Sequence, residues 1–156
     1  MNLPARLLLH LGFLALSAHA AVVRVAITDR SDSGNTGYDQ LSGKLHFEID
    51  PKQPQNAIIA DVDLAPMNAA GKVSFAADLR LWKPKDDSRS NGAAWVEIPN
   101  RGGKASLSEW VMKAGFTLVN VSWEFDVAAD KMRLEVPRAQ NKDGSPIRGV
   151  VSAVFT

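Results

Sequence analysis

The chain has 156 residues, with 18 basic and 17 acidic side chains and no cysteine. Such a balanced charge gives no electrostatic footprint for nucleic acid or for an anionic membrane surface, so neither is an expected partner. The lack of cysteine excludes disulfides and thiolate chemistry, and the length suits one domain held together by its core alone.

The first twenty residues have the three parts of a secretory signal peptide. Arg6 makes the start cationic, residues 7–16 (LLLHLGFLAL) are apolar, and Ala18-His19-Ala20 is a small-residue cleavage site. The apolar run is about half of the roughly 20 residues that a membrane-spanning helix needs. We therefore expect residues 1–20 to be removed, the protein to be periplasmic or secreted, and residues 21–156 to contain no membrane span.

The first half of the mature chain is predicted to be rich in strands. Alternating apolar and β-branched residues indicate strands, and loops rich in Gly, Ser, Asp and Pro separate them. The predicted strands are residues 22–28, 45–49, 57–64, 72–82 and 93–98. In the third of these, Asp61 and Asp63 would share one face, and a solvated surface is a better interpretation of this pair than a metal site.

Residues 100–121 predict a compact β-loop-α-β unit. Residues 100–104 (NRGGK) form a tight loop, Ser106 and Glu109 have the spacing of a capping box, and an apolar stripe then runs at helical spacing to Gly115. Residues 116–121 (FTLVNV) are apolar enough for a strand buried on both faces. Because such units pack with their strands parallel, we expect residues 93–98 and 116–121 to run in the same direction.

The rest of the chain lacks helix signals. Residues 132–136 and 148–155 both alternate, and a turn at residues 141–144 (NKDG) lies between them. This pattern predicts a hairpin.

The loop at residues 100–104 is the leading candidate site. Its backbone N–H groups, those of Arg101, Gly102 and Gly103, precede a helix N-terminus, where unpaired donors favour negative charge. A loop of this kind after a parallel strand can form an oxyanion hole. The alternative is a plain turn whose glycines allow close packing.

Three further candidates follow the next predicted strand. Trp123, Glu124 and Asp126 come directly after residues 116–121, at the carboxyl end of a parallel strand. Ligands in open α/β sheets bind at that edge, so these side chains either form the rim of a cleft or belong to an exposed loop.

No catalytic residue, metal or cofactor is expected in this chain. The nucleophile motif G-x-S-x-G is absent from the sequence, and His46 is the only histidine after the signal peptide. Alternation places His46 opposite Leu45 and Phe47, in a solvent-facing position. The tryptophans at positions 82, 95, 110 and 123 could stack on sugars, but their spacing favours core positions.

Six segments carry a resemblance to a known family. They are residues 38–51 (YDQLSGKLHFEIDP), 57–66 (AIIADVDLAP), 68–75 (NAAGKVSF), 98–104 (IPNRGGK), 114–123 (AGFTLVNVSW) and 141–146 (NKDGSP). Their content and order resemble the N-terminal part of large exported proteins known as alpha/beta hydrolase domain proteins.

The resemblance implies an α/β fold, in which residues 21–156 are the strand-rich leading part of an incomplete alpha/beta-hydrolase-like domain. It also implies esterase-like hydrolysis of a small ester-like substrate by a longer protein. The loop at residues 100–104 would hold the place of the oxyanion loop, and the nucleophile, acid and histidine would lie beyond Thr156, leaving this fragment inactive. The alternative is a non-catalytic, exported, β-rich binding domain for carbohydrate or envelope partners, and the oligomeric state is open under both.

Overall fold

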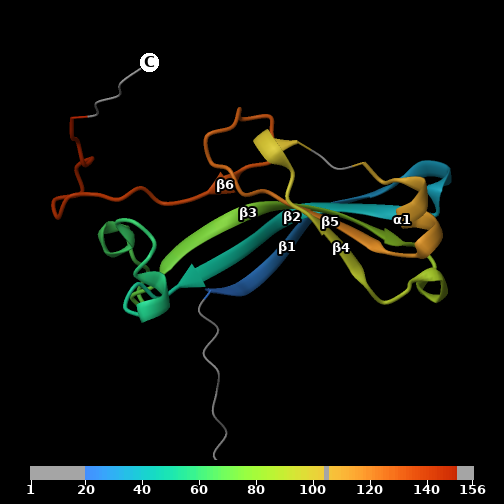
Figure 1. Cartoon of the computed structure of the whole chain (residues 1–156), viewed down its shortest axis with the longest axis horizontal. Coiled ribbons are helices and arrows are strands. Elements are labelled where there is room, and N and C mark those ends of the chain that lie inside the picture. Colours follow the sequence, from blue (N-terminus) through green and yellow to red (C-terminus); the bar gives the residue numbers. More distant parts are fainter. Residues whose placement is uncertain (1–19, 104–105, 151–156) are drawn as a thin grey trace, which may run out of the picture.

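The computed structural model describes residues 20–103 and 106–150, and most of these residues belong to or surround one sheet (Figure 1). The predicted signal peptide lies outside the described residues except for Ala20. The strands are β1 (Ala20–Asp32), β2 (Tyr38–Ile49), β3 (Val73–Pro84), β4 (Ala94–Glu97), β5 (Thr117–Val121) and β6 (Leu134–Glu135). The helices are α1 (Glu109–Ala114) and the 3-10 helices η1 (Gly34–Thr36), η2 (Pro54–Asn56), η3 (Val62–Leu64), η4 (Asp87–Arg89) and η5 (Asn100–Gly102).

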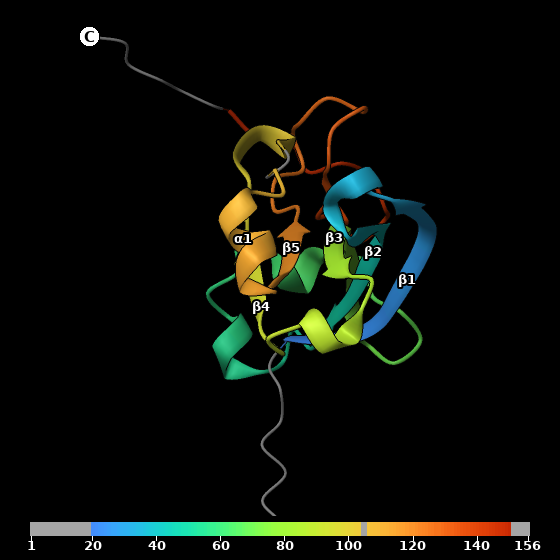
Figure 2. The ribbon, with the colours of Figure 1, turned by 90° about the vertical axis from the view of Figure 1, so that its right-hand side faces the viewer.

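The prediction of an α/β fold is wrong. Within the described residues, six strands form one mixed sheet in the order β1-β2-β3-β5-β4, with β6 also pairing with β3, and α1 is only six residues long. Figure 2 shows the strands side by side with α1 next to β4 and β5. The long strands β1, β2 and β3 follow one another as antiparallel neighbours, which need only short turns. A helix is required only at the single parallel crossover.

That crossover confirms the predicted direction of the two strands. β4 and β5 pair in parallel, with Trp95 opposite Leu118. Gly115 ends α1 as expected, with φ 73° and its N–H donating to the carbonyl of Met112 at 3.2 Å.

The predicted start of the helix is wrong. The N-cap of α1 is Ser108, which makes no side-chain capping hydrogen bond, and the capping box from Ser106 does not form. Glu109 instead pairs with Lys113 one turn along the helix, at 2.7 Å.

Two other predicted elements also differ. Residues 57–64 are turns and the 3-10 helix η3, not a strand, because tertiary packing overrides the local β pattern: Val62 is buried against Ile49 and Val73. The predicted hairpin reduces to β6 and one isolated bridge between Gln140 and Pro146. Residues 148–150 are not in a strand, and the remainder of that predicted strand lies outside the described residues.

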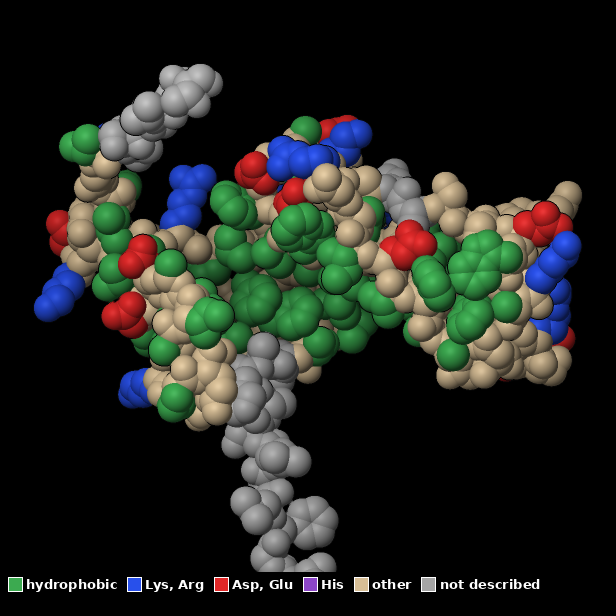
Figure 3. All heavy atoms as spheres, viewed as in Figure 1, with side chains coloured by type: hydrophobic (Ala, Val, Ile, Leu, Met, Phe, Trp, Pro, Cys, Tyr) green, Lys and Arg blue, Asp and Glu red, His purple; other side chains and the backbone are tan. Residues whose placement is uncertain are grey.

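The register gives the sheet two different faces. Val111 of α1 packs on one face against Tyr38, Trp82 and Leu118. The other face is apolar along paired positions of β2 and β3, namely Leu45 with Ala77, Phe47 with Phe75 and Ile49 with Val73. Residues from η3 cover only its Ile49 end, where a second core cluster forms. Figure 3 shows hydrophobic side chains gathered in the centre of the molecule, with a second group near α1.

A hydrogen-bonded junction forms where β5 leaves β3 and β6 replaces it. The hydroxyl of Ser122 accepts from the N–H of Asp78 at 2.7 Å and donates to the carbonyl of Arg133 at 2.6 Å. Ser122 is buried, and the N–H of Asp78 also donates directly to the carbonyl of Arg133 at 3.1 Å. The junction makes the chain loop out between residues 122 and 133, which brings residues 123–126 beside η5.

Candidate functional site

The structure brings together the residues predicted for the carboxyl edge of β4 and β5. The Arg101 guanidinium lies 3.0 Å from a carboxylate oxygen of Asp126, and the Arg101 N–H donates to Glu124 Oε2 at 2.5 Å. The indole N–H of Trp123 donates to the carbonyl of Pro99 at 3.2 Å. The parallel pairing of β4 and β5 causes this proximity, because it places the ends of both strands at one edge of the sheet.

Two of the three predicted oxyanion donors already have protein acceptors. The Arg101 N–H is bonded to Glu124, and the Gly103 N–H donates to the carbonyl of Asn100 at 3.1 Å. Arg101 and Gly102 both have left-handed backbone conformations, with φ 52° and 65°. An oxyanion at this loop would have to displace the Glu124 carboxylate. In this structure, the loop therefore binds the carboxylate of Glu124 and not the oxygen of a substrate.

Only one of the four tryptophans occupies the core position that the sequence favoured for all of them. Trp82 is buried, whereas Trp95, Trp110 and Trp123 are 41%, 49% and 52% exposed. Trp95 and Trp110 make an edge-to-face contact with ring centroids 4.8 Å apart, next to Phe116. Their spacing correctly indicates the elements that carry them, but the short helix α1 leaves both rings partly open to solvent.

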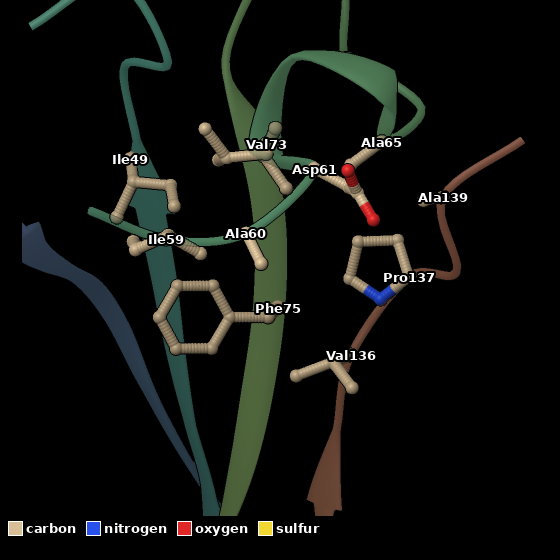
Figure 4. A pocket seen from close by; sticks show the side chains of 11 residues that line it. Ile49, Ile59, Ala60, Asp61, Ala65, Val73, Phe75, Val136, Pro137 and Ala139 are labelled. Atoms are coloured by element: carbon tan, nitrogen blue, oxygen red, sulfur yellow. The ribbon is translucent and has the colours of Figure 1, made fainter. Parts of the chain in front are cut away.

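The apolar face of the sheet contains a groove that the sequence analysis missed (Figure 4). It has a volume of about 230 Å³. Its floor is the end of β2 and β3, and its walls are the segment that includes η3 and the segment after β6. The residues that line it are Ile49, Ile59, Ala60, Asp61, Val62, Ala65, Val73, Phe75, Val136, Pro137 and Ala139.

Hydrogen bonds hold the two walls in place. The N–H of Gln140 donates to the carbonyl of Leu64 at 3.0 Å, which ties the segment after β6 to η3. The side-chain amide of Asn56 donates to the carbonyl of Asp50 at 2.8 Å, which anchors the start of the other wall to the end of β2. The groove is therefore built by backbone and side-chain bonds as well as by apolar contact.

Asp61 is the one charged residue among the eleven described residues that line the groove. Figure 4 shows its carboxylate at one end of the groove, beside Ala65, Pro137 and Ala139. Asp61 has a left-handed backbone with φ 55°, a conformation that Asp tolerates better than most residues, and it is the N-cap of η3. The arrangement can hold an apolar group with a polar end facing Asp61.

Sequence reasoning could find only part of this groove. Alternation in residues 45–49 and 72–82 correctly predicted the apolar side chains of its floor. The wall at residues 57–64 was predicted as a further strand, and no local pattern shows that it folds over Ile49 and Val73. The interpretation of Asp61 and Asp63 as exposed side chains agrees with the structure.

Within residues 20–103 and 106–150, no group of three or more His, Asp or Glu side chains could hold a metal ion. His46 Nε2 lies 2.6 Å from Nη2 of Arg24, its partner on the neighbouring strand β1. The same residues include no helix long and apolar enough to cross a membrane.

Compared with models of protein families, with curated proteins and with solved structures, the chain matches none.

Proposed function

We propose that this chain is an exported, non-catalytic, strand-rich module that binds a small apolar ligand. The groove at the ends of β2 and β3 carries the proposal, because it is concave, its lining is almost entirely apolar, and it has one polar group to orient a ligand. Export is part of the proposal and is supported by the signal-peptide pattern in residues 1–20.

The volume of the groove limits the size of the ligand. An engineered cavity of about 150 Å³ holds benzene, so a groove of about 230 Å³ fits roughly six to nine non-hydrogen atoms. At about 0.6 kcal/mol per non-hydrogen atom, within the usual range, n-hexanol would bind with a Kd on the order of 1 mM. Such a ligand matches the groove in size and in polarity.

Titration of n-hexanol into the ¹⁵N-labelled chain, followed by NMR, tests this function. Ala60 lines the groove and is exposed, so A60F should fill the groove without disturbing the core and should weaken binding at least tenfold. The matched control is A57F, because Ala57 is also exposed on the same segment but does not line the groove. The proposal is refuted if hexanol shifts no groove amide, or if both variants bind it equally.

A second candidate is that the chain supplies one portion of an esterase-like hydrolase for a small ester-like substrate. The observation that favours it is the parallel crossover, which gathers Arg101, Glu124 and Asp126 at the carboxyl edge of β4 and β5. The sequence of the gene beyond codon 156 is the test. A downstream G-x-S-x-G followed by an acid and a histidine would support this candidate, and their absence would refute it.

A further inference from the structure

We propose that the ligand of the groove is a small aliphatic primary amine, with its ammonium group at Asp61 and its chain along Phe75 and Val136. This inference rests on the function proposed above and names the chemical class of ligand for the same site. It follows from the position of one carboxylate at the end of an otherwise apolar groove (Figure 4).

The Asp61 carboxylate is available to a ligand. Within the described part of the chain, no ion pair and no side-chain hydrogen bond engages it, and although Asp61 is the N-cap residue of η3, its carboxylate makes no capping hydrogen bond. By contrast, the carboxylates of Asp78 and Asp126 lie within 3.0 Å of a Lys or Arg nitrogen. An ammonium group at the mouth of the groove would give Asp61 the kind of partner that those two already have.

The charges around Asp61 determine which ligand head group the groove is expected to prefer. Arg138 and Asp61 both line a second cavity, which shares Asp61 and Ala139 with the groove, but the two residues form no ion pair in the described structure. Asp63, two residues along, is exposed on η3 and does not line the groove. Asp61 therefore attracts the ammonium group of a ligand, and Arg138 repels it. For a ligand with a carboxylate, Asp61 repels the head group and Arg138 attracts it.

The carboxylate is exposed, so its effect on affinity is modest. Exposed ion pairs change an equilibrium by up to about fivefold, whereas each buried methylene changes it by about fourfold. We expect the apolar chain to supply most of the affinity and Asp61 to choose the head group. n-Hexylamine should bind about threefold to fivefold more tightly than n-hexanol, and hexanoate should bind more weakly than either.

The test compares these three probes on the full chain at pH 7 and low salt, with Kd values from NMR titration. D61N should abolish the preference, so that hexylamine and hexanol bind this variant with equal Kd values, and it should keep the groove folded, since Asn also tolerates the left-handed backbone. R138Q should strengthen hexylamine binding by about twofold to threefold. D63N is the matched control and should change neither affinity. About 0.5 M NaCl should reduce the preference in the wild-type protein.

The outcomes separate the two proposals. If hexanol and hexylamine bind the wild-type groove equally, or if the preference survives in D61N, the amine inference is wrong and the apolar binding function stands. If none of the three probes shifts the groove amides, the binding function itself fails, and the inference fails with it.

Discussion

Replacing Gly102 with alanine should destabilise the protein through a clash at one defined point. A Cβ atom at this position would lie 2.6 Å from Cβ of Lys131 and 2.7 Å from the carbonyl oxygen of Met132. Gly102 is buried and has φ 65°, so alanine would meet both a left-handed backbone and a crowded site. The backbone conformation costs about 1–2 kcal/mol and the overpacking about 1–3 kcal/mol, which together give about 2–5 kcal/mol.

G92A is the matched control. Gly92 has φ 75° but nothing within 4 Å of its would-be Cβ, so this variant carries only the backbone cost of about 1–2 kcal/mol. Urea unfolding of the wild-type protein and both variants, followed by far-UV circular dichroism, gives the two losses in unfolding free energy. If both variants lose the same free energy within about 0.5 kcal/mol, η5 does not pack against residues 131–132 as described.

Three further predictions concern hydrogen bonds and ionisation. Tyr38, the only tyrosine, is buried, and burial raises its pKa above the ordinary value, so titration at 295 nm should give a pKa above 10. The stability that this raised pKa contributes should be present below pH 10 and lost as the pH rises through the folded value, and Y38F should remove that alkaline step. S122A should cost about 1 kcal/mol, because the N–H of Asp78 and the carbonyl of Arg133 each lose a hydrogen bond to the Ser122 hydroxyl but keep the direct bond between them, and hydrogen exchange at residues near Arg133 should speed up more than exchange in β4. A hydrogen bond from Lys85 lowers the pKa of Asp32, so D32N should lower the melting temperature at pH 6, and the difference from the wild-type protein should shrink as the pH falls through the folded pKa of Asp32.

The sequence predicted that residues 101–103 and residues 123–126 lie at the same edge of the sheet, but not the hydrogen bonds between them. The segment order and the parallel crossover were sufficient to place Arg101 near Glu124 and Asp126. The bond from the Arg101 N–H to Glu124 depends on how residues 122–133 loop out from the junction at Ser122. That path is set by contacts between segments more than forty residues apart, which a local pattern does not contain.

The fold class was wrong for a similar reason. The family resemblance implied an α/β architecture, which agrees with the one parallel crossover, whereas the longest strands are antiparallel neighbours. Strand alternation is the same for a strand that pairs with an antiparallel neighbour and for one at the edge of a parallel sheet. The pairing partner therefore had to come from the tertiary structure.

The sequence by itself determined three strands, predicted at residues 72–82, 93–98 and 116–121 and found at 73–84, 94–97 and 117–121, together with the parallel pair and the end of α1 at Gly115. These features depend on side-chain alternation and on glycine conformation, which are local properties. Only the tertiary structure decided that residues 57–64 fold over the sheet, that three tryptophans lie at the surface, and that Asp61 stands at the end of an apolar groove. Burial depends on which distant segments pack together, so the alternating pattern shows which face of a strand is apolar but not what covers it.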